Sequence, residues 1–195
     1  MLTDYLSTSS SQWRNQIGKG KAVDWPAGLS ADGNEGVSKL VAGTENSIGY
    51  VELAYALTAG LKYADIQNSA GNFIEPTLDS VSEAVEVRLP EIPTMGDKSW
   101  SNVALVNAPG AKSYPITSFS YLVLYKDLST IPIMNQRKAQ ELIDFISWSI
   151  NEGQRFASEL NYVPLPNQIV ELNNMTLQSI VFNGKSIIIN STISS

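Results

Sequence analysis

Two spacings of apolar residues recur along the chain, and together they predict a mixture of helices and strands. Residues 37–41 place apolar side chains three and four positions apart, which is the spacing of one helix face. Residues 118–125 instead contain a nearly continuous apolar run, which is typical of a strand that is covered on both faces. Because helices and strands alternate from residue 48 to residue 177, the pattern predicts the α/β class.

Local signals set the ends of several predicted helices. Asn34 and Thr77 are expected to cap the helices that follow them, and Gly60 is expected at the C-cap of a short helix over residues 53–60. Further helices are predicted over 2–17 (interrupted by "STSSS"), 78–85, 135–153 and 167–180, with a short helical stretch at 154–160. The apolar face expected for the helix at 135–153 comprises Leu142, Phe145, Ile146 and Ser149, broadened by Ile143 and Ile150.

Strands are predicted where short apolar runs are bounded by turn residues. These runs are 48–52, the two segments on either side of "SAGN" at 69–72, 103–106, and 118–125, the strongest of the set. We find no internal repeat.

The composition excludes several classes of function but does not identify one. The 195 residues carry a net charge of −6, which argues against DNA, RNA or any other polyanion as a partner. There is no cysteine and no histidine, which excludes disulfides, the usual zinc sites, thiol nucleophiles and a Ser-His-Asp triad. No apolar run approaches a membrane span, and no signal peptide is expected at the N-terminus. Asn-X-Thr triplets begin at Asn174 and Asn190, and we expect them to have arisen by chance.

Several motifs, in order along the chain, resemble one family. They are "DYLS", "GKAVDWPAGL", "GNEGVSKLV" and "SIGYVELAYA" within residues 4–56, "AGNFIEPT" at 70–77, "SYPITSFSYLVLYKD" at 113–127, and "DFISWSINEGQRFASELNYVPLPNQIVE" at 144–171. In this combination and order they resemble the phosphate-binding proteins, the periplasmic or extracellular solute receptors of the phosphate ABC importer. The resemblance covers nearly the whole chain.

The resemblance implies a type II periplasmic-binding-protein-like α/β fold, in which crossover strands join two lobes that close on the ligand. Residues 1–111 are then expected to form the C-terminal half of lobe two, and residues 112–195 the returning segment that completes lobe one. The family's N-terminal half is expected to be missing. The family's phosphate-binding loops would fall before Met1, so the resemblance transfers no ligand-binding residue to this chain.

Two candidate functional sites remain: one residue and one short segment. Asn34 stands at a predicted helix start, which could hold an anion, although an ordinary capped helix beside the cleft is the favoured interpretation. The segment Tyr114, Pro115, Ile116 and Thr117 resembles the family's crossover, and we expect it to act as a hinge; the alternative is a simple edge-strand proline.

Other candidate chemistry is not supported by spacing. Four carboxylates were considered as a catalytic pair or metal cluster and are expected to be solvated instead: Glu45, Glu52, Asp65 and Glu75. Four tryptophans were considered as a sugar platform and are expected to serve packing: Trp13, Trp25, Trp100 and Trp148. The serines at 9–11 have no recognisable base. We therefore expect no enzyme, cofactor or metal, but part of a phosphate receptor that works with importer membrane subunits. The alternatives are a non-binding module of the same fold and, less favoured, a phosphatase-like enzyme.

Overall fold

The computed structural model describes residues 1–189, which form two compact units. The first unit comprises Met1–Val87 and Leu105–Ser118, and the second comprises Arg88–Ala104 and the described residues from Phe119 onward. This grouping differs from the boundary predicted between residues 111 and 112, and the assignment of either stretch to a lobe stays a prediction. No helix within residues 1–189 combines the length and the apolarity needed to cross a bilayer. The Asn-X-Thr triplet at 190–192 lies outside the described residues.

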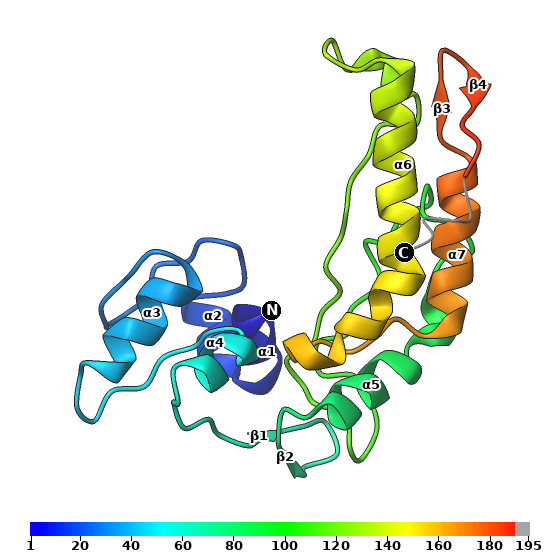
Figure 1. Cartoon of the computed structure of the whole chain (residues 1–195). Helices are drawn as coiled ribbons and strands as arrows, with labels where there is room; N and C mark the ends of the chain where they lie inside the picture. Colours follow the sequence, from blue (N-terminus) through cyan, green and yellow to red (C-terminus); the bar gives the residue numbers. More distant parts are fainter. Residues whose placement is uncertain (190–195) are drawn as a thin grey trace. The chain divides into compact units, whose positions relative to one another are not determined.

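Most of the regular structure in residues 1–189 is helical, and two short antiparallel hairpins complete it (Figure 1). In the first unit the elements are α1 (Leu2–Ser9), α2 (Ser11–Gln16), α3 (Gly33–Ala42), α4 (Leu53–Thr58), β1 (Ile66–Gln67), β2 (Phe73–Ile74) and α5 (Leu78–Glu86). In the second unit they are the 3₁₀ turns η1 (Leu89–Glu91) and η2 (Leu128–Thr130), α6 (Gln136–Ile150), η3 (Glu152–Phe156), η4 (Ser158–Leu160), α7 (Asn167–Gln178), β3 (Val181–Phe182) and β4 (Lys185–Ser186).

Side-chain caps explain where several helices begin. Ser10 separates α1 from α2 because its extended backbone breaks the helix and its Oγ accepts a hydrogen bond from the Trp13 N–H at 3.1 Å. Thr77 caps α5 as predicted: its Oγ1 accepts from the Ser80 N–H at 3.1 Å, and the Ser80 Oγ accepts from the Thr77 N–H at 3.0 Å. The interrupted helix at the N-terminus and the start of α5 are therefore confirmed.

The predicted end of α4 is also confirmed, with a shift of one residue. The C-cap is Ala59, and Gly60 follows it with a φ of 65°. The Leu61 N–H donates to the Ala56 carbonyl at 2.9 Å and the Gly60 N–H donates to the Leu57 carbonyl at 3.1 Å, which is the Schellman pattern of helix ends. A left-handed residue is required here, and glycine adopts this conformation without steric cost.

The predicted hairpin around residues 69–72 is present. Ile66 pairs with Ile74 and Gln67 with Phe73 in an antiparallel register. The Asn68 N–H donates to the Asn72 carbonyl at 2.8 Å and closes the turn.

Three other strand predictions are wrong. Within residues 1–189, none of the segments 48–52, 103–106 and 118–125 pairs with another strand. A strand is stabilised by a neighbouring strand, and a sequence pattern cannot say whether that neighbour is present. Residues 48–51 and 120–125 make no backbone hydrogen bond within residues 1–189.

The second unit is built around two apolar clusters. One comprises Leu128, Ala139, Ile143, Ile146, Leu177 and Ile180, and it is formed where α6 and α7 lie side by side (Figure 1). The other comprises Ile92, Ile169 and Leu172, covered by Trp100, Phe119 and neighbouring side chains. Burial of each large aliphatic side chain contributes about 1.5–3 kcal/mol relative to exposure, before chain entropy is subtracted.

The predicted face of α6 is confirmed for Ile143 and Ile146, which are buried, and for Leu142 and Ile150, which pack against the same cluster; it is wrong for Phe145. Ala139, Ile143 and Ile146 are the buried residues of this helix, whereas Phe145 is 60% exposed. Phe145 instead stacks on Trp148, with ring centroids 6.2 Å apart. The prediction also missed Ala139, which is buried on this face but is too small to stand out in a pattern of large apolar side chains.

The β3–β4 hairpin was not predicted, although Asn183-Gly184 is a strong two-residue turn signal. Asp127 holds this hairpin to η2. Its Oδ1 accepts from the Ser129 N–H (3.0 Å), the Ser129 hydroxyl (2.7 Å) and the Asn183 N–H (3.1 Å), and its Oδ2 accepts from the Gly184 N–H (3.1 Å).

Candidate functional site

The segment predicted as a hinge, Tyr114–Thr117, is firmly bonded within the first unit. The Tyr114 N–H donates to the Ser80 carbonyl at 2.9 Å, and the Pro115 carbonyl accepts from the Asn107 N–H at 2.8 Å. Pro115 is fully buried, and Thr117 is buried with its hydroxyl donating to the Tyr114 carbonyl at 3.0 Å. Burial raises the pKa of the Tyr114 phenol. The chain therefore leaves this unit, between residues 118 and 119, from a well-anchored segment.

Asn68 anchors the loop that leads into this segment. Its side chain is buried, and its Nδ2 donates to three backbone carbonyls, those of Gly110, Ala111 and Ser113, at 3.1, 3.2 and 3.2 Å. Its Oδ1 accepts from the N–H groups of Ala70 and Asn72 at 3.0 and 3.1 Å. Sequence reasoning missed this residue; the available signal was an asparagine at the head of a glycine-containing turn, where a side chain can bond to the backbone nearby.

Asn34 does not cap its helix, and that expectation is wrong. The N-cap of α3 is Asp32, which makes no side-chain cap hydrogen bond, and Asn34 lies within the first turn. The Asn34 Oδ1 accepts from the Glu52 N–H at 3.0 Å, and thereby fixes the residue that precedes α4. The sequence could not show this bond because it joins positions 18 residues apart.

The charges at this helix start are unfavourable for an anion. The carboxylates of Asp32 and Glu35 both lie at the N-terminus of α3, where the helix dipole already favours negative charge. Glu35 pairs with Lys39 one turn later, and the hydrogen bond from this ammonium lowers the pKa of the Glu35 carboxyl. An anion bound here would have to approach two carboxylates.

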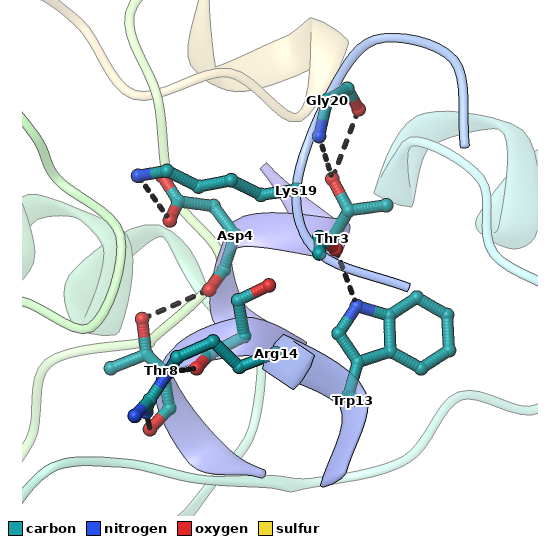
Figure 2. A network of polar contacts seen from close by, with 9 residues as sticks. Thr3, Asp4, Thr8, Trp13, Arg14, Lys19 and Gly20 are labelled. Atoms are coloured by element: carbon teal, nitrogen blue, oxygen red, sulfur yellow. Dashed lines mark hydrogen bonds and ion pairs between the residues drawn. The ribbon is translucent and has the colours of Figure 1, made fainter. Parts of the chain in front are cut away.

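A polar network closes the N-terminal helices on the loop after them (Figure 2). The Thr3 hydroxyl donates to the Gly20 carbonyl at 3.0 Å, and Lys19 forms an ion pair with Asp4 at 3.0 Å. The Arg14 guanidinium donates to the last carbonyls of α1, at residues 7 and 8, over 2.6 and 3.2 Å. Because every labelled side chain in Figure 2 is bonded to a neighbouring part of the chain, the network serves structure.

The four tryptophans fall into separate aromatic groups. The ring centroids of Trp13 and Trp25 lie 5.2 Å apart. Trp25 in turn stacks on Tyr50, with ring centroids 5.4 Å apart. In the second unit, Trp100 packs edge-on against Phe119 and Tyr121, and Trp148 packs against Phe145 and Phe156. The structure thus brings Trp13 and Trp25 together, which the sequence did not predict.

The candidate carboxylates do not form a metal site. Among residues 1–189 there is no group of three or more His, Cys, Asp or Glu that could hold a metal ion. Glu75 accepts a hydrogen bond from the Tyr63 hydroxyl at 3.0 Å, and this bond raises the pKa of the Tyr63 phenol. A shallow depression is lined by Leu57, Gly60, Leu61, Lys62, Tyr63, Asp65 and Glu75. With two carboxylates and a single ammonium, this lining does not suit phosphate.

Comparison with known proteins identifies the relatives of the chain. Residues 3–152 match the model of a family described as the PBP superfamily domain. The chain is 37% identical over 175 residues to a phosphate-binding protein PstS of Xylella fastidiosa (strain 9a5c), covering 87% of this chain and 44% of that protein. It is 39% identical over 169 residues to the phosphate-binding protein PstS of Haemophilus influenzae (87% of this chain, 48% of that protein). It is 31% identical over 179 residues to that of Methanocaldococcus jannaschii (88% and 46%). The chain therefore spans less than half the length of these relatives.

Proposed function

Because this chain belongs to the PBP superfamily domain family, we propose that it is part of a receptor that binds inorganic phosphate for an ABC importer. The observation that carries the proposal is the 37–39% identity, over 87% of the chain, to proteins named phosphate-binding protein. In this proposal the chain supplies scaffold and hinge, and the groups that contact phosphate lie in the family's remaining length. Bound phosphate would be held by backbone and hydroxyl donors, which is compatible with a net charge of −6.

The test is a single-chain hybrid. The part of the Haemophilus influenzae relative that lies outside the match is joined upstream of Met1, where the resemblance places it, and phosphate is titrated calorimetrically. We expect the hybrid to bind at about micromolar Kd or tighter, and residues 1–195 alone to bind weakly or not at all. A cooperatively folded hybrid without phosphate binding would contradict the proposed function. Micromolar binding by the chain alone would contradict the proposal that the groups that contact phosphate lie in the family's remaining length.

We propose further that Tyr114–Thr117 lies at the hinge. Support comes from its position, since the chain passes from the first unit to the second directly after residue 118. The buried Pro115 and the bonded Thr117 would hold one side of the hinge rigid while the residues that follow absorb the rotation. Backbone hydrogen exchange at residues 114–119 of the hybrid should change on addition of phosphate; unchanged exchange would count against a hinge here.

We propose a supporting role beside the cleft for Asn34. Its hydrogen bond to the Glu52 N–H and the carboxylates around it favour scaffold over ligand contact. In the hybrid, Asn34→Ala should lower the melting temperature while the phosphate Kd changes by less than about threefold, since a direct hydrogen bond would be worth more than that. A larger loss of affinity would place Asn34 on the ligand.

The importer and the location follow from the same proposal. We propose that the complete receptor acts outside the cytoplasmic membrane and hands phosphate to the importer's membrane subunits. Expressed with an export signal in a bacterium that lacks its own receptor, the hybrid should restore growth on limiting phosphate. Failure of a folded, phosphate-binding hybrid to do so would contradict the role in import.

A further inference from the structure

Asn183 and Gly184 form the turn of the β3–β4 hairpin, and they are the only Asn-Gly pair in the sequence. Their φ angles are both positive, 50° and 70°. Turns of this kind have the backbone twist of paired strands. Both residues are exposed, whereas Phe182 and Ile187 on either side of the turn pack against the cluster around Ile143. The arms of the hairpin are therefore seated on the unit, and water reaches its tip.

An asparagine that is followed by glycine can lose its side-chain amide without an enzyme. The glycine nitrogen attacks the side-chain carbonyl carbon, Cγ, and forms an N–C bond. The amide group leaves as ammonia and takes up the proton of that nitrogen. The product is a five-membered succinimide, which water then opens to aspartate or isoaspartate without any oxidant or reductant. Glycine favours this reaction because it has no side chain to hinder the approach of its nitrogen.

The Asp127 carboxylate holds the nitrogen that would react. The Gly184 N–H donates to Asp127 Oδ2, and the Asn183 N–H donates to Asp127 Oδ1, both at 3.1 Å. Hydrogen bonds from an N–H group to a carboxylate are stronger than those between neutral groups. The reaction also places negative charge on the Gly184 nitrogen as its proton leaves, and the nearby carboxylate disfavours that charge. In the closed hairpin this nitrogen is therefore a poor nucleophile.

Ring closure also requires a rotation of the peptide between Asn183 and Gly184. The pairing of β3 with β4 fixes the two ends of the turn. Asp127 is itself held in place, because it accepts hydrogen bonds from the Ser129 N–H at 3.0 Å and the Ser129 hydroxyl at 2.7 Å. The rotation thus needs the turn to leave Asp127. Local opening of this kind costs less free energy than unfolding of the whole unit.

We propose that Asn183 is a site of spontaneous deamidation controlled by Asp127: the reaction is slow while the carboxylate holds the turn and proceeds when the turn opens. The original turn does not form again afterwards. Aspartate at position 183 adds a negative charge to the residue whose own N–H contacts Asp127, and isoaspartate adds a backbone atom to a turn of two residues. Deamidation therefore leaves a permanent trace of the opening. The inference does not depend on what the chain binds.

The first test needs no variant. Residues 1–195 are incubated at neutral pH, in buffer and in guanidinium chloride at matched ionic strength. Peptide mapping by mass spectrometry follows the conversion of Asn183 to aspartate and isoaspartate. We expect the reaction to be at least about tenfold slower in the folded protein, because it waits for the turn to open.

Two variants test whether Asp127 sets the rate. Asp127→Asn removes the charge that holds both N–H groups, and it should speed deamidation of Asn183 in buffer at least about fivefold. Gly96→Ala is the matched control in the same unit. It overpacks a loop against α7, since a Cβ there would stand 2.7 Å from the Thr176 Cγ2, and it leaves the contacts of the turn in place. The rate at Asn183 should not change in this variant.

Each sample also contains an internal reference. Asn46 precedes the small residue Ser47, has a φ of 58° and is exposed in the first unit, so its own deamidation should not respond to Asp127→Asn. Where Asp127→Asn does not melt cooperatively, Ser129→Ala takes its place. This change removes the hydroxyl that orients the carboxylate, and it should speed the reaction at Asn183 about twofold or more.

Four results would overturn the proposal. Equal rates in buffer and in guanidinium chloride would mean that the folded turn gives no protection, and no deamidation at Asn183 in either would remove the site itself. An unchanged rate in the folded variant at Asp127 or Ser129 would show that the carboxylate does not control the reaction. Equal acceleration by Gly96→Ala would assign the reaction to opening of the whole unit.

Discussion

Single polar residues hold much of the first unit, and their partners are remote in sequence. Asn68 uses both ends of its amide, toward the turn that follows it and toward carbonyls more than 40 residues away. The residues next to Asn68 in the sequence give no sign of its hydrogen bonds to the distant carbonyls. A sequence pattern therefore predicts that such a residue stands in a turn, but not that it joins two segments.

Asp127 gives a pH dependence that can be measured. Hydrogen bonds from Ser129, and from the turn at residues 183 and 184, lower the pKa of its carboxyl from the ordinary value of 3.8. A carboxyl with a lowered pKa in the folded state contributes stability above its unfolded pKa, and the contribution is lost as pH falls through the folded value. Asp127→Asn should therefore destabilise the second unit at about pH 7, and the difference from the unchanged protein should shrink as pH falls from 3.8 through the lowered pKa of the folded state.

Thermal melts of the two proteins across this pH range, at fixed ionic strength, check the prediction. Asp97→Asn is the control, because the Asp97 carboxylate lies 3.7 Å from the Lys126 ammonium on the exposed surface, where an ion pair contributes little. A difference between Asp127→Asn and the unchanged protein that persists at the acidic end would contradict the assigned role of the carboxylate.

At the scale of elements, α7 is fitted closely to the loop before it. The Gly96 N–H donates to the Thr176 Oγ1 at 2.8 Å, and a Cβ on Gly96 would stand 2.7 Å from the Thr176 Cγ2. Gly96→Ala should therefore lower the free energy of unfolding by about 1–3 kcal/mol through overpacking. Chemical denaturation measures this loss.

Two further variants make the comparison specific. In Gly96→Ala combined with Thr176→Ala, the clash is removed but the hydrogen bond is lost, so the double variant should lose less than the sum of the two single changes. Gly43→Ala, at the C-cap of α3 with a φ of −90°, has ordinary space for a Cβ and should be neutral or slightly stabilising. Strict additivity of the two changes at 96 and 176 would contradict the close fit.

The elements also show what a sequence pattern can and cannot predict. The caps at Thr77 and Gly60, the hairpin around residues 69–72, α6 and α7 were predictable because their signals are local. The strands expected at 48–52 and 118–125 were not formed, because a strand depends on a neighbour that the pattern does not contain. The resemblance gave no ligand-binding residue to look for within the chain, so the sequence predicted no such contact.

At the scale of the whole molecule, the family match confirms the predicted α/β, periplasmic-binding-protein-like class. The two units nevertheless differ in how they are stabilised. Among the described residues, the buried polar side chains all belong to the first unit: Thr3, Ser7, Ser38, Asn68, Ser80, Ser113 and Thr117. Both clusters of buried aliphatic side chains belong to the second unit.

This difference predicts that the first unit opens more easily. Hydrogen bonds contribute about 1 kcal/mol each, whereas a buried aliphatic side chain contributes about 1.5–3 kcal/mol. Native-state hydrogen exchange should therefore show amides of α3 exchanging at least about tenfold faster than those of α6 around Ile143. Equal protection of the two helices would mean that the units unfold together.

The exposed apolar side chains of Leu122, Val123 and Tyr125 bear on how the chain is made in the cell. Ribosomes release a chain from its N-terminus, and segments fold as they emerge. Residues 120–125 emerge after the whole N-terminal stretch of the first unit, so their side chains become available for contacts late in synthesis. Until they are covered, these uncharged and exposed side chains can associate with other copies of the chain or with a chaperone, so yield and solubility depend on how soon they are covered.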